Sequence, residues 1–248
     1  MESIIKKAAE KILNSKYTFA YTGAGISVES GIPPFRGENS LWSKYDPKIL
    51  DLTYFTENPK DSWEVIKEIF YDFFGNADPN RAHKVLARME SENLLKSIVT
   101  QNIDNLHQAA GSKTVYEFHG NSQKLVCMSC NDFITADEAD FSVMPLSCKK
   151  CDGLMKPDFI FFGEQIPPFA YEKSLEAAKQ ADVCIIVGST GEVMPAAMIP
   201  VEAKRNGAFV IEVNPDESLF TGQTTDIHLQ GKAGDVFEML EKEIFKGG

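Results

Sequence analysis

The segment from Tyr17 to Gly37 restricts the fold of this chain more than any other part of its sequence. It begins with a short apolar run that has the length and side-chain types of a buried strand. The run ends at Gly23-Ala24-Gly25, and the helical pattern that follows stops at Gly31-Ile32-Pro33-Pro34. Glycines let the backbone approach a phosphate closely, and the unpaired N–H groups at a helix start attract the anion. The segment therefore predicts a phosphate-binding turn after a strand of an α/β fold.

The glycine pattern is close to a dinucleotide-binding fingerprint but does not complete it. Ser27-Val28 stands where the third glycine of G-x-G-x-x-G would lie. On the glycines alone, a plain strand-to-helix turn of any α/β domain explains the pattern equally well. The residues beyond the turn favour a nucleotide site. Phe35 and Arg36 follow two prolines that fix the backbone, as expected of a flap over a bound ligand.

Length and charge narrow the classes of protein. The 248 residues, 43% of them hydrophobic, suffice for one large domain, or for one domain with a small insert. A net charge of −11 repels DNA and anionic membranes, so we expect no sequence-specific nucleic-acid binding and favour a basic peptide as partner. No stretch approaches the roughly 20 apolar residues of a membrane span, and the charged N-terminal segment is not a signal peptide. We therefore expect a cytoplasmic protein.

Short apolar runs alternate with helical patterns and lie at 17–21, 97–102, 114–118, 181–189 and 208–214. This alternation predicts a doubly wound parallel sheet of the Rossmann type. The segment Lys156–Glu164 is expected to rejoin that sheet. Residues 38–95 differ, because they hold mainly helical patterns, and they predict a helical insertion over the nucleotide site.

Within the insertion, Asp61–Phe74 is apolar at eight of its fourteen positions, which is too wide a stripe for a surface helix. We favour the core of the insertion for this stripe over the lining of an apolar channel. His83 is interpreted as a structural histidine.

Two C-x-x-C pairs predict a metal site. Cys127 and Cys130 are separated from Cys148 and Cys151 by seventeen residues, which is the spacing of a zinc ribbon. Four thiolates complete a closed tetrahedral shell, so we expect one structural Zn²⁺. Cys184 lies in an apolar run and is interpreted as a small buried side chain.

Polar and small residues follow several predicted strands. Gln101-Asn102-Ile103-Asp104 follows the second run and His119 the third, while Gly188-Ser189-Thr190 and Asn214-Pro215 follow later ones. In open α/β sheets, ligands bind where the carboxyl ends of the strands converge. We therefore predict a functional role for His119, and a local capping or hydrogen-bonding role for His107.

The motifs GAGIS with GIPPFRG, TQNIDNLH, HGN, the two C-x-x-C pairs, FFGE, VGST with MPAA, and VNP occur in this order over nearly the whole chain. This combination resembles the sirtuin family of NAD-dependent protein-lysine deacylases, in its single-domain bacterial or archaeal type. The resemblance implies a Rossmann-type domain and a small domain made of a helical insertion and a zinc ribbon. NAD and an acyl-lysine peptide would meet in the cleft between them. We expect a monomer whose modules are 1–37 with 96–122 and 157–248 (Rossmann), 38–95 (insertion) and 123–156 (zinc ribbon).

The resemblance also implies site residues by position. Those expected to contact NAD are Gly23, Ala24, Gly25, Val28, Phe35, Arg36, Gln101, Asn102, Ile103, Asp104, His119, Gly188, Ser189, Thr190, Asn214, Pro215, Lys232 and Ala233. Those expected to contact the peptide are Ile160, Phe162, Gly163, Glu164 and Val193. Those expected to act in catalysis are His119, as the general base, with Asn102 and Asp104.

In the family, the acyl oxygen attacks the ribose as nicotinamide leaves, and the products are nicotinamide, O-acyl-ADP-ribose and free lysine. The peptide would bind by strand addition. Members that remove succinyl groups carry a tyrosine and an arginine, three residues apart, where this chain has Ile66 and Ile69. We therefore expect acetyl or other neutral acyl groups as substrates.

Two other functions are compatible with the same motifs. One is a protein ADP-ribosyltransferase, since another nucleophile could meet the same ribose carbon. The other is a non-catalytic NAD-sensing or zinc-ribbon interaction protein. The presence of His119, Asn102 and Asp104 together argues against the second.

Overall fold

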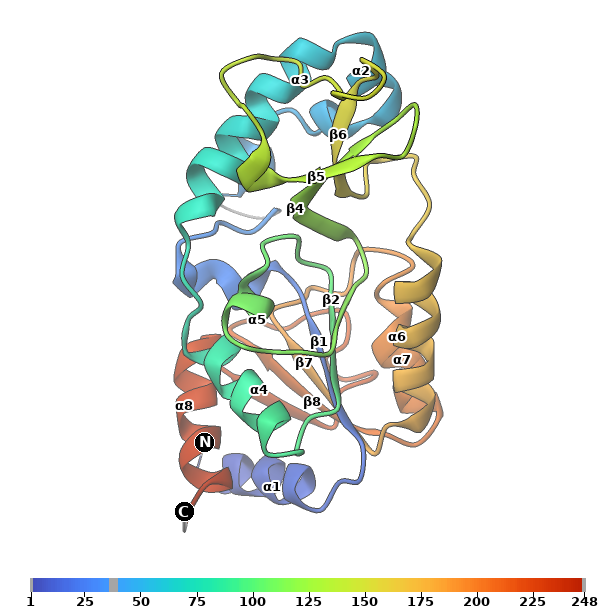
Figure 1. Ribbon diagram of the computed structural model, residues 1–248. Coiled ribbons are helices and arrows are strands. Elements are labelled where there is room, and N and C mark those ends of the chain that lie inside the picture. The colour runs from blue at the N-terminus through green and yellow to red at the C-terminus, as the bar shows by residue number, and fades with distance from the viewer. Residues whose placement is uncertain (1, 36–39, 247–248) are drawn as a thin grey trace.

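The structure is a computed structural model that describes residues 2–35 and 40–246, apart from the side chains of Phe73 and Asn76. Its larger part is a parallel sheet, to which these residues contribute six strands (Figure 1). The strands are β1 (Thr18–Thr22), β2 (Ser97–Thr100), β3 (Val115–Glu117), β7 (Val183–Val187), β8 (Phe209–Asn214) and β9 (Ile227–Gln230).

The strand order is β3-β2-β1-β7-β8-β9, which is the order of Rossmann-type sheets. The direction in which strands are added reverses between β1 and β7, so the carboxyl ends of these two strands border the crevice where such folds bind ligands. The predicted fold class is confirmed. Strand β9 was not predicted, because its four residues alternate apolar and polar side chains at an edge of the sheet.

Helices cover both faces of this sheet (Figure 1). One face is covered by α1 (Glu2–Leu13), α4 (Arg81–Ser91) and α8 (Ala233–Ile244), and the other by α6 (Pro168–Gln180) and α7 (Met198–Arg205). Each helix buries an apolar stripe at helical spacing. In α1, for example, Ile5, Ala8 and Ile12 are buried against the sheet.

The smaller part contains an antiparallel sheet in the order β5-β4-β6 (Figure 1). Its elements are β4 (Gly120–Cys127), β5 (Phe133–Thr135), β6 (Met155–Phe159), α2 (Leu52–Glu57), α3 (Pro59–Ile66) and a π-helix at Lys67–Phe73. The expectation that Lys156–Glu164 rejoins the parallel sheet is wrong, since β6 pairs with β4. The two cysteine pairs must lie together to share a metal, which brings the strands beside them together as well.

The apolar stripe of Asp61–Phe74 forms the core of this smaller part, as predicted. Trp63 and Ile66 are fully buried there, and Trp63 Nε1 donates to the Met155 carbonyl at 2.9 Å. Helix α4, also within 38–95, instead packs on α8 and the large sheet. This packing favours a boundary before Arg81 between the helical insertion and the Rossmann-type domain. The module limits given by the sequence stay a prediction.

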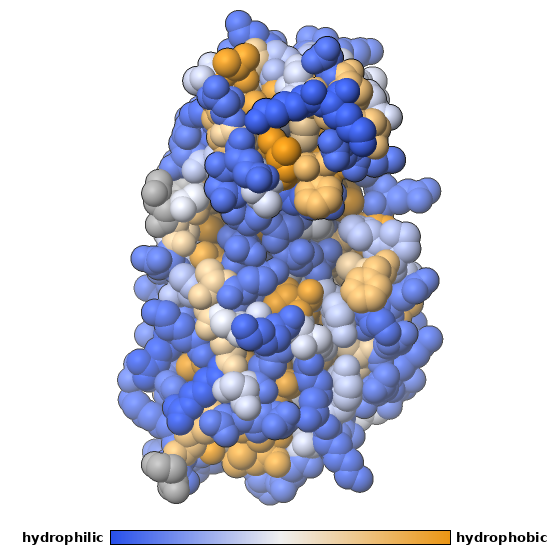
Figure 2. All heavy atoms as spheres, in the orientation of Figure 1, coloured by the Kyte–Doolittle hydropathy of each residue, from blue (hydrophilic) through white to orange (hydrophobic). Residues whose placement is uncertain are grey.

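Among the described residues, no helix has the length and apolar composition needed to cross a membrane. The face in Figure 2 is mostly hydrophilic, and its apolar residues form separate patches.

Candidate active site

The glycine turn after β1 lies against the end of β7. A 3₁₀ helix at Ala24–Ser30 follows the turn, where the sequence predicted a regular helix. Gly25 N donates to Gly188 O at 2.9 Å. Gly188 has a φ of +63°, and a Cβ there would lie 2.3 Å from Ile26 N. Glycine is therefore required for the two segments to meet backbone to backbone at the crevice.

Two polar side chains that follow β2 converge on Ser27, which is fully buried. Ser27 Oγ donates to Asp104 Oδ2 at 2.6 Å and accepts from Asn102 Nδ2 at 3.2 Å. Burial raises the pKa of the Asp104 carboxyl, and the Ser27 hydrogen bond opposes that shift. Sequence reasoning missed Ser27, although its position two residues after Gly25 was visible.

His119 follows β3, and its ring is oriented by the backbone. Its Nδ1 lies 3.1 Å from Gln101 O, and a carbonyl can only accept, so Nδ1 carries the proton. In the neutral ring, Nε2 then has a free lone pair. Burial lowers the pKa of His119, which keeps the ring neutral near pH 7.

Hydrogen bonds also join the end of β2 to the ends of β7 and β8. Gln101 Nε2 donates to Ser189 Oγ at 3.1 Å, and Asn214 Nδ2 donates to Ser189 O, also at 3.1 Å. Asn214 Nδ2 also donates to the buried carboxylate of Glu212, which accepts hydroxyl hydrogen bonds from three residues of the next loop. These three are Ser218, Thr221 and Thr225. Asn214 is thereby held next to Ser189.

The other predicted NAD contacts lie in several different segments of the chain. Phe35 packs against Trp42 at a ring separation of 5.6 Å, and Ile103 is buried beside Asn102. Lys232 and Ala233 begin α8 next to Gly231, whose N–H donates to Asn214 O. Thr190, Pro215 and Val28 are exposed. Arg36 lies outside the described residues.

The predicted peptide segment is held by one of its edges. Phe162 N donates to Leu50 O at 2.8 Å, and Leu52 N donates to Phe162 O at 3.2 Å. The Phe162 side chain is 50% exposed. The Glu164 carboxylate is directed to Lys156, at 3.1 Å, so a peptide contact by Glu164 would come from its backbone.

Two histidines are buried beneath the Asn102 region. His107 Nε2 lies 2.9 Å from Thr22 Oγ1, a residue of β1, so the local role predicted for His107 is wrong. Its ring contacts that of His83 at 4.9 Å. Neither nitrogen of His83 has a hydrogen-bond partner among the described residues, and burial lowers the pKa of His83 to about 4. His83 is structural, as predicted.

The buried His83 predicts a loss of stability in mild acid. Its pKa is lower in the folded chain than the 6.5 of an unfolded one, so the unfolded state binds more protons between pH 6.5 and 4. Stability is present above pH 6.5 and falls by roughly 3 kcal/mol as the pH drops to 4. Urea unfolding at several pH values, for the wild type and His83→Gln, measures this difference. Equal slopes with pH in the two proteins would contradict it.

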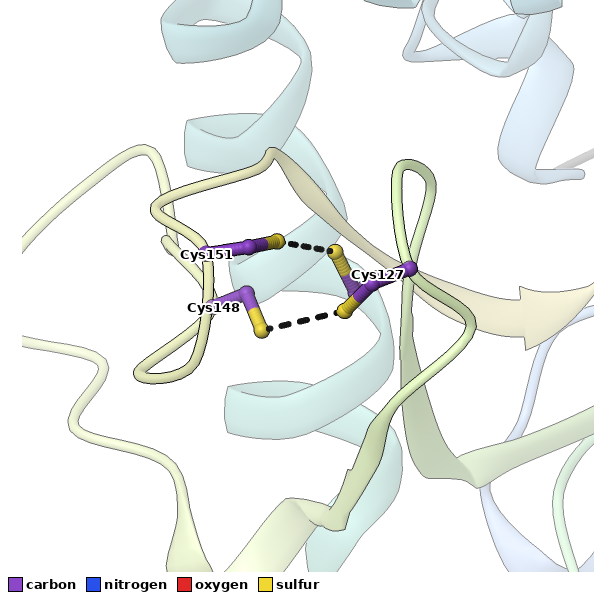
Figure 3. Close-up of side chains that lie close together, drawn as sticks. Cys127, Cys148 and Cys151 are labelled. Carbon is purple, nitrogen blue, oxygen red and sulfur yellow. Dashed lines mark hydrogen bonds between the residues drawn. The ribbon is translucent and has the colours of Figure 1, made fainter.

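The four cysteines of the two C-x-x-C pairs lie together in the smaller part, and Figure 3 shows Cys148 and Cys151 facing the hairpin of Cys127. Their four sulfur atoms all lie within 4.8 Å of one another, with Cys127–Cys151 at 3.5 Å and Cys130–Cys148 at 3.7 Å. Tetrahedral zinc with Zn–S bonds of about 2.3 Å places sulfurs about 3.8 Å apart. The donor set therefore fits one Zn²⁺.

Comparison with known proteins gives the family. The Sir2 family model matches residues 23–195. A relative from Archaeoglobus fulgidus, "NAD-dependent protein deacylase 1", is 39% identical over 97% of this chain and 98% of its own. A solved mutant Sir2 homologue in complex with ADP-ribose has a TM-score of 0.92 at 39% identity, covering 97% of this chain and 96% of that one. A solved complex described as "Sir2-p53 peptide-NAD+" has a TM-score of 0.89 at 32% identity, covering 96% and 98%.

A Rossmann-type sheet with polar strand ends at its crevice, joined to a four-cysteine module, defines an α/β enzyme of the nucleotide-binding class. Within that class, the chain belongs to the Sir2 family, the sirtuins.

Proposed function

We propose that this chain is an NAD-dependent protein-lysine deacylase. It removes acetyl or other neutral acyl groups from lysine side chains and yields nicotinamide, O-acyl-ADP-ribose and free lysine. The observation that carries the proposal is that Asn102 and Asp104 both bond to Ser27 after the glycine turn, while the His119 ring is held on the carbonyl of Gln101, the neighbour of Asn102. The relatives named NAD-dependent protein deacylases cover almost the whole chain and support it.

The residues around the crevice divide between the two ends of NAD. Ser189 and Asn214, held together by hydrogen bonds, suit the adenosine half. The first turn would bring Gly23, Ala24 and Gly25 close to the phosphates, because glycine lets the backbone approach a ligand. The N–H groups of Gly23 and Gly25 already donate to Val187 O and Gly188 O, so a phosphate would meet the N–H of Ala24. Asn102, Ser27 and Asp104 suit the nicotinamide end, where a carboxamide needs both a donor and an acceptor.

Bound NAD would supply an electrophilic ribose carbon once nicotinamide leaves. Nε2 of His119 would accept a proton from a ribose hydroxyl, and the Gln101 carbonyl holds the ring in the tautomer that allows this. Phe35, packed against Trp42, helps to keep water from the reacting carbon.

The acyl-lysine peptide binds as an added strand along the Phe162–Glu164 segment and near Val193. At Phe162 the segment is bridged to Asp51 in parallel fashion, and it then turns at Gly163, whose φ is +95°. Backbone pairing tolerates many peptide sequences. The solved complex described as "Sir2-p53 peptide-NAD+" supports the binding of a peptide together with NAD.

Labelled NAD distinguishes deacylation from ADP-ribosyl transfer to protein. The chain is incubated with an acetyl-lysine peptide, a carrier protein and NAD labelled in the adenosine half. The proposal predicts that the label appears on a small molecule, acetyl-ADP-ribose. Label retained mainly on protein would instead support the transferase.

The acyl preference follows from two buried residues. Ile66 and Ile69 are 0% and 1% exposed within the apolar core of the smaller part. Neither provides a cation for an acyl carboxylate, so we expect the kcat/KM for succinyl-lysine peptide to be at least about 10-fold below that for acetyl-lysine peptide, which corresponds to about 1.4 kcal/mol. Steady-state kinetics on one peptide sequence carrying either group measures the ratio. Faster removal of succinyl would contradict the assignment.

We also propose a monomeric, cytoplasmic protein, with the modules given by the sequence and a boundary before Arg81. Gel filtration with light scattering tests the oligomeric state.

A further inference from the structure

Lys156, in β6, is the only lysine among the buried residues of the described chain. Its Nζ donates to Pro157 O at 2.8 Å and to Phe159 O at 3.0 Å, and it lies 3.1 Å from Glu164 Oε2. The ammonium also lies over the Phe161 ring, 4.7 Å from its centre. An ammonium has three N–H donors, and here each has an oxygen acceptor. All three N–H donors of Lys156 therefore bind oxygen atoms of this chain, and none remains for a ligand.

The contacts of Lys156 close the segment 157–164 into a fixed loop. The two carbonyls belong to the middle and the last residue of β6, whereas Glu164 lies five residues after that strand. Glu164 Oε2 also accepts a hydrogen bond from Phe161 N at 2.7 Å. The ion pair thus holds both ends of the loop, while the Phe162 side chain between them stays half-exposed.

This loop contacts the backbone of the catalytic histidine, and it contains the segment proposed to bind the peptide. Ile160 N donates to His119 O at 2.8 Å. Within the loop, Phe162 exchanges two backbone hydrogen bonds with Leu50 and Leu52, and the turn that follows is closed by Glu164 N, which donates to Phe161 O at 3.0 Å. A shift of this loop would therefore move both the main chain of His119 and the edge along which an extended peptide pairs.

We propose that Lys156 and Glu164 form a positioning pair that sets the 160–164 loop in the conformation that binds acyl-lysine peptide. The inference rests on the proposed deacylase function. A buried charge that loses its partner is left uncompensated, so removing either member should displace the loop. NAD would be affected less, because Ser189 and Asn214 are held by bonds that do not include this loop.

Kinetics of four variants test the pair. Lys156→Met keeps the length of the side chain but removes its charge, and it should raise the KM for acetyl-lysine peptide at least ten-fold while the Kd for NAD stays within two-fold. Lys156→Arg keeps the charge and should recover at least part of the loss. Glu164→Gln keeps the volume and should raise the peptide KM several-fold. The control is Lys124→Met, which removes an exposed lysine paired with Asp158 in the same small sheet and should leave both constants unchanged.

Several outcomes would overturn the pair. One is an unchanged peptide KM in Lys156→Met, or in Glu164→Gln if the methionine variant fails to fold. Another is a parallel loss of peptide binding, NAD binding and zinc, which would indicate a general structural role, and a third is an arginine variant no better than the methionine one. A wild type that shows no peptide-dependent nicotinamide release would contradict both the deacylase function and the pair. A fully active Lys156→Met would contradict the pair alone.

Discussion

Replacing His119 with alanine is expected to lower the rate of lysine deacetylation by about 10²–10⁴-fold, the usual contribution of a positioned general base. The Nδ1 position of His119 faces the Gln101 carbonyl, so the free Nε2 is the nitrogen that can accept a proton. The variant is compared with the wild type in a peptide deacetylation assay. Calorimetry of NAD binding is the control, and the Kd should change by less than about three-fold, because a base acts mainly on the transition state.

The pH profile gives a second view of the same residue. Burial lowers the pKa of His119 below 6.5, so the protonated, inactive ring accumulates only in acid. The acidic limb of kcat/KM should therefore lie below pH 6.5 in the wild type and disappear in His119→Ala. An unchanged deacetylation rate in the variant, or an acidic limb above pH 7, would remove His119 from the catalytic role.

Loss of the metal is expected to have the other large effect. Cys148→Ser breaks a set of four sulfurs that lie within 4.8 Å of one another, and both Cys127 and Cys148 are buried in the apolar core of the smaller part. Structural zinc contributes folding free energy directly, and a loss of roughly 5 kcal/mol lowers the melting temperature of a chain this long by about 10–20 °C. Metal analysis measures the zinc content, and thermal unfolding measures the melting temperature. Deacetylase activity should fall together with both.

Cys184→Ser is the matched control for the metal site. Cys184 is also buried, but it lies in β7 of the large sheet, away from the cluster. The Cys184→Ser variant should keep one equivalent of zinc. Equal zinc content in the wild type and Cys148→Ser would contradict the four-cysteine site.

The large fold was predictable because its signals are local. The apolar runs at 17–21, 97–102, 114–118, 181–189 and 208–214 each contain a strand of the parallel sheet, as with Thr18–Thr22 before Gly23. Strand β9 and helix α6 were missed, since an edge strand of four residues and a helix of moderate amphipathicity give weak patterns. The cysteine spacing predicted the metal cluster, because two knuckles and a tetrahedral ion leave little choice of arrangement.

The contacts that were missed join residues far apart in the chain. Ser27 and Asp104 are separated by 77 positions, and His107 and Thr22 by 85, so no local pattern reports either contact. The sequence-based prediction assigned Lys156–Glu164 to the parallel sheet, whereas β6 pairs with β4. An apolar run indicates a strand, but it does not indicate which strand will be its neighbour. The resemblance to the sirtuins supplied residue roles that spacing alone could not.

Nicotinamide release, measured with and without an acetyl-lysine peptide, tests most directly whether the crevice joins NAD to an acyl-lysine. We predict that release depends on the acetylated peptide, and that each nicotinamide is accompanied by one acetyl-ADP-ribose and one free lysine. Release that is the same with the unmodified peptide, or no release at all, would contradict the account.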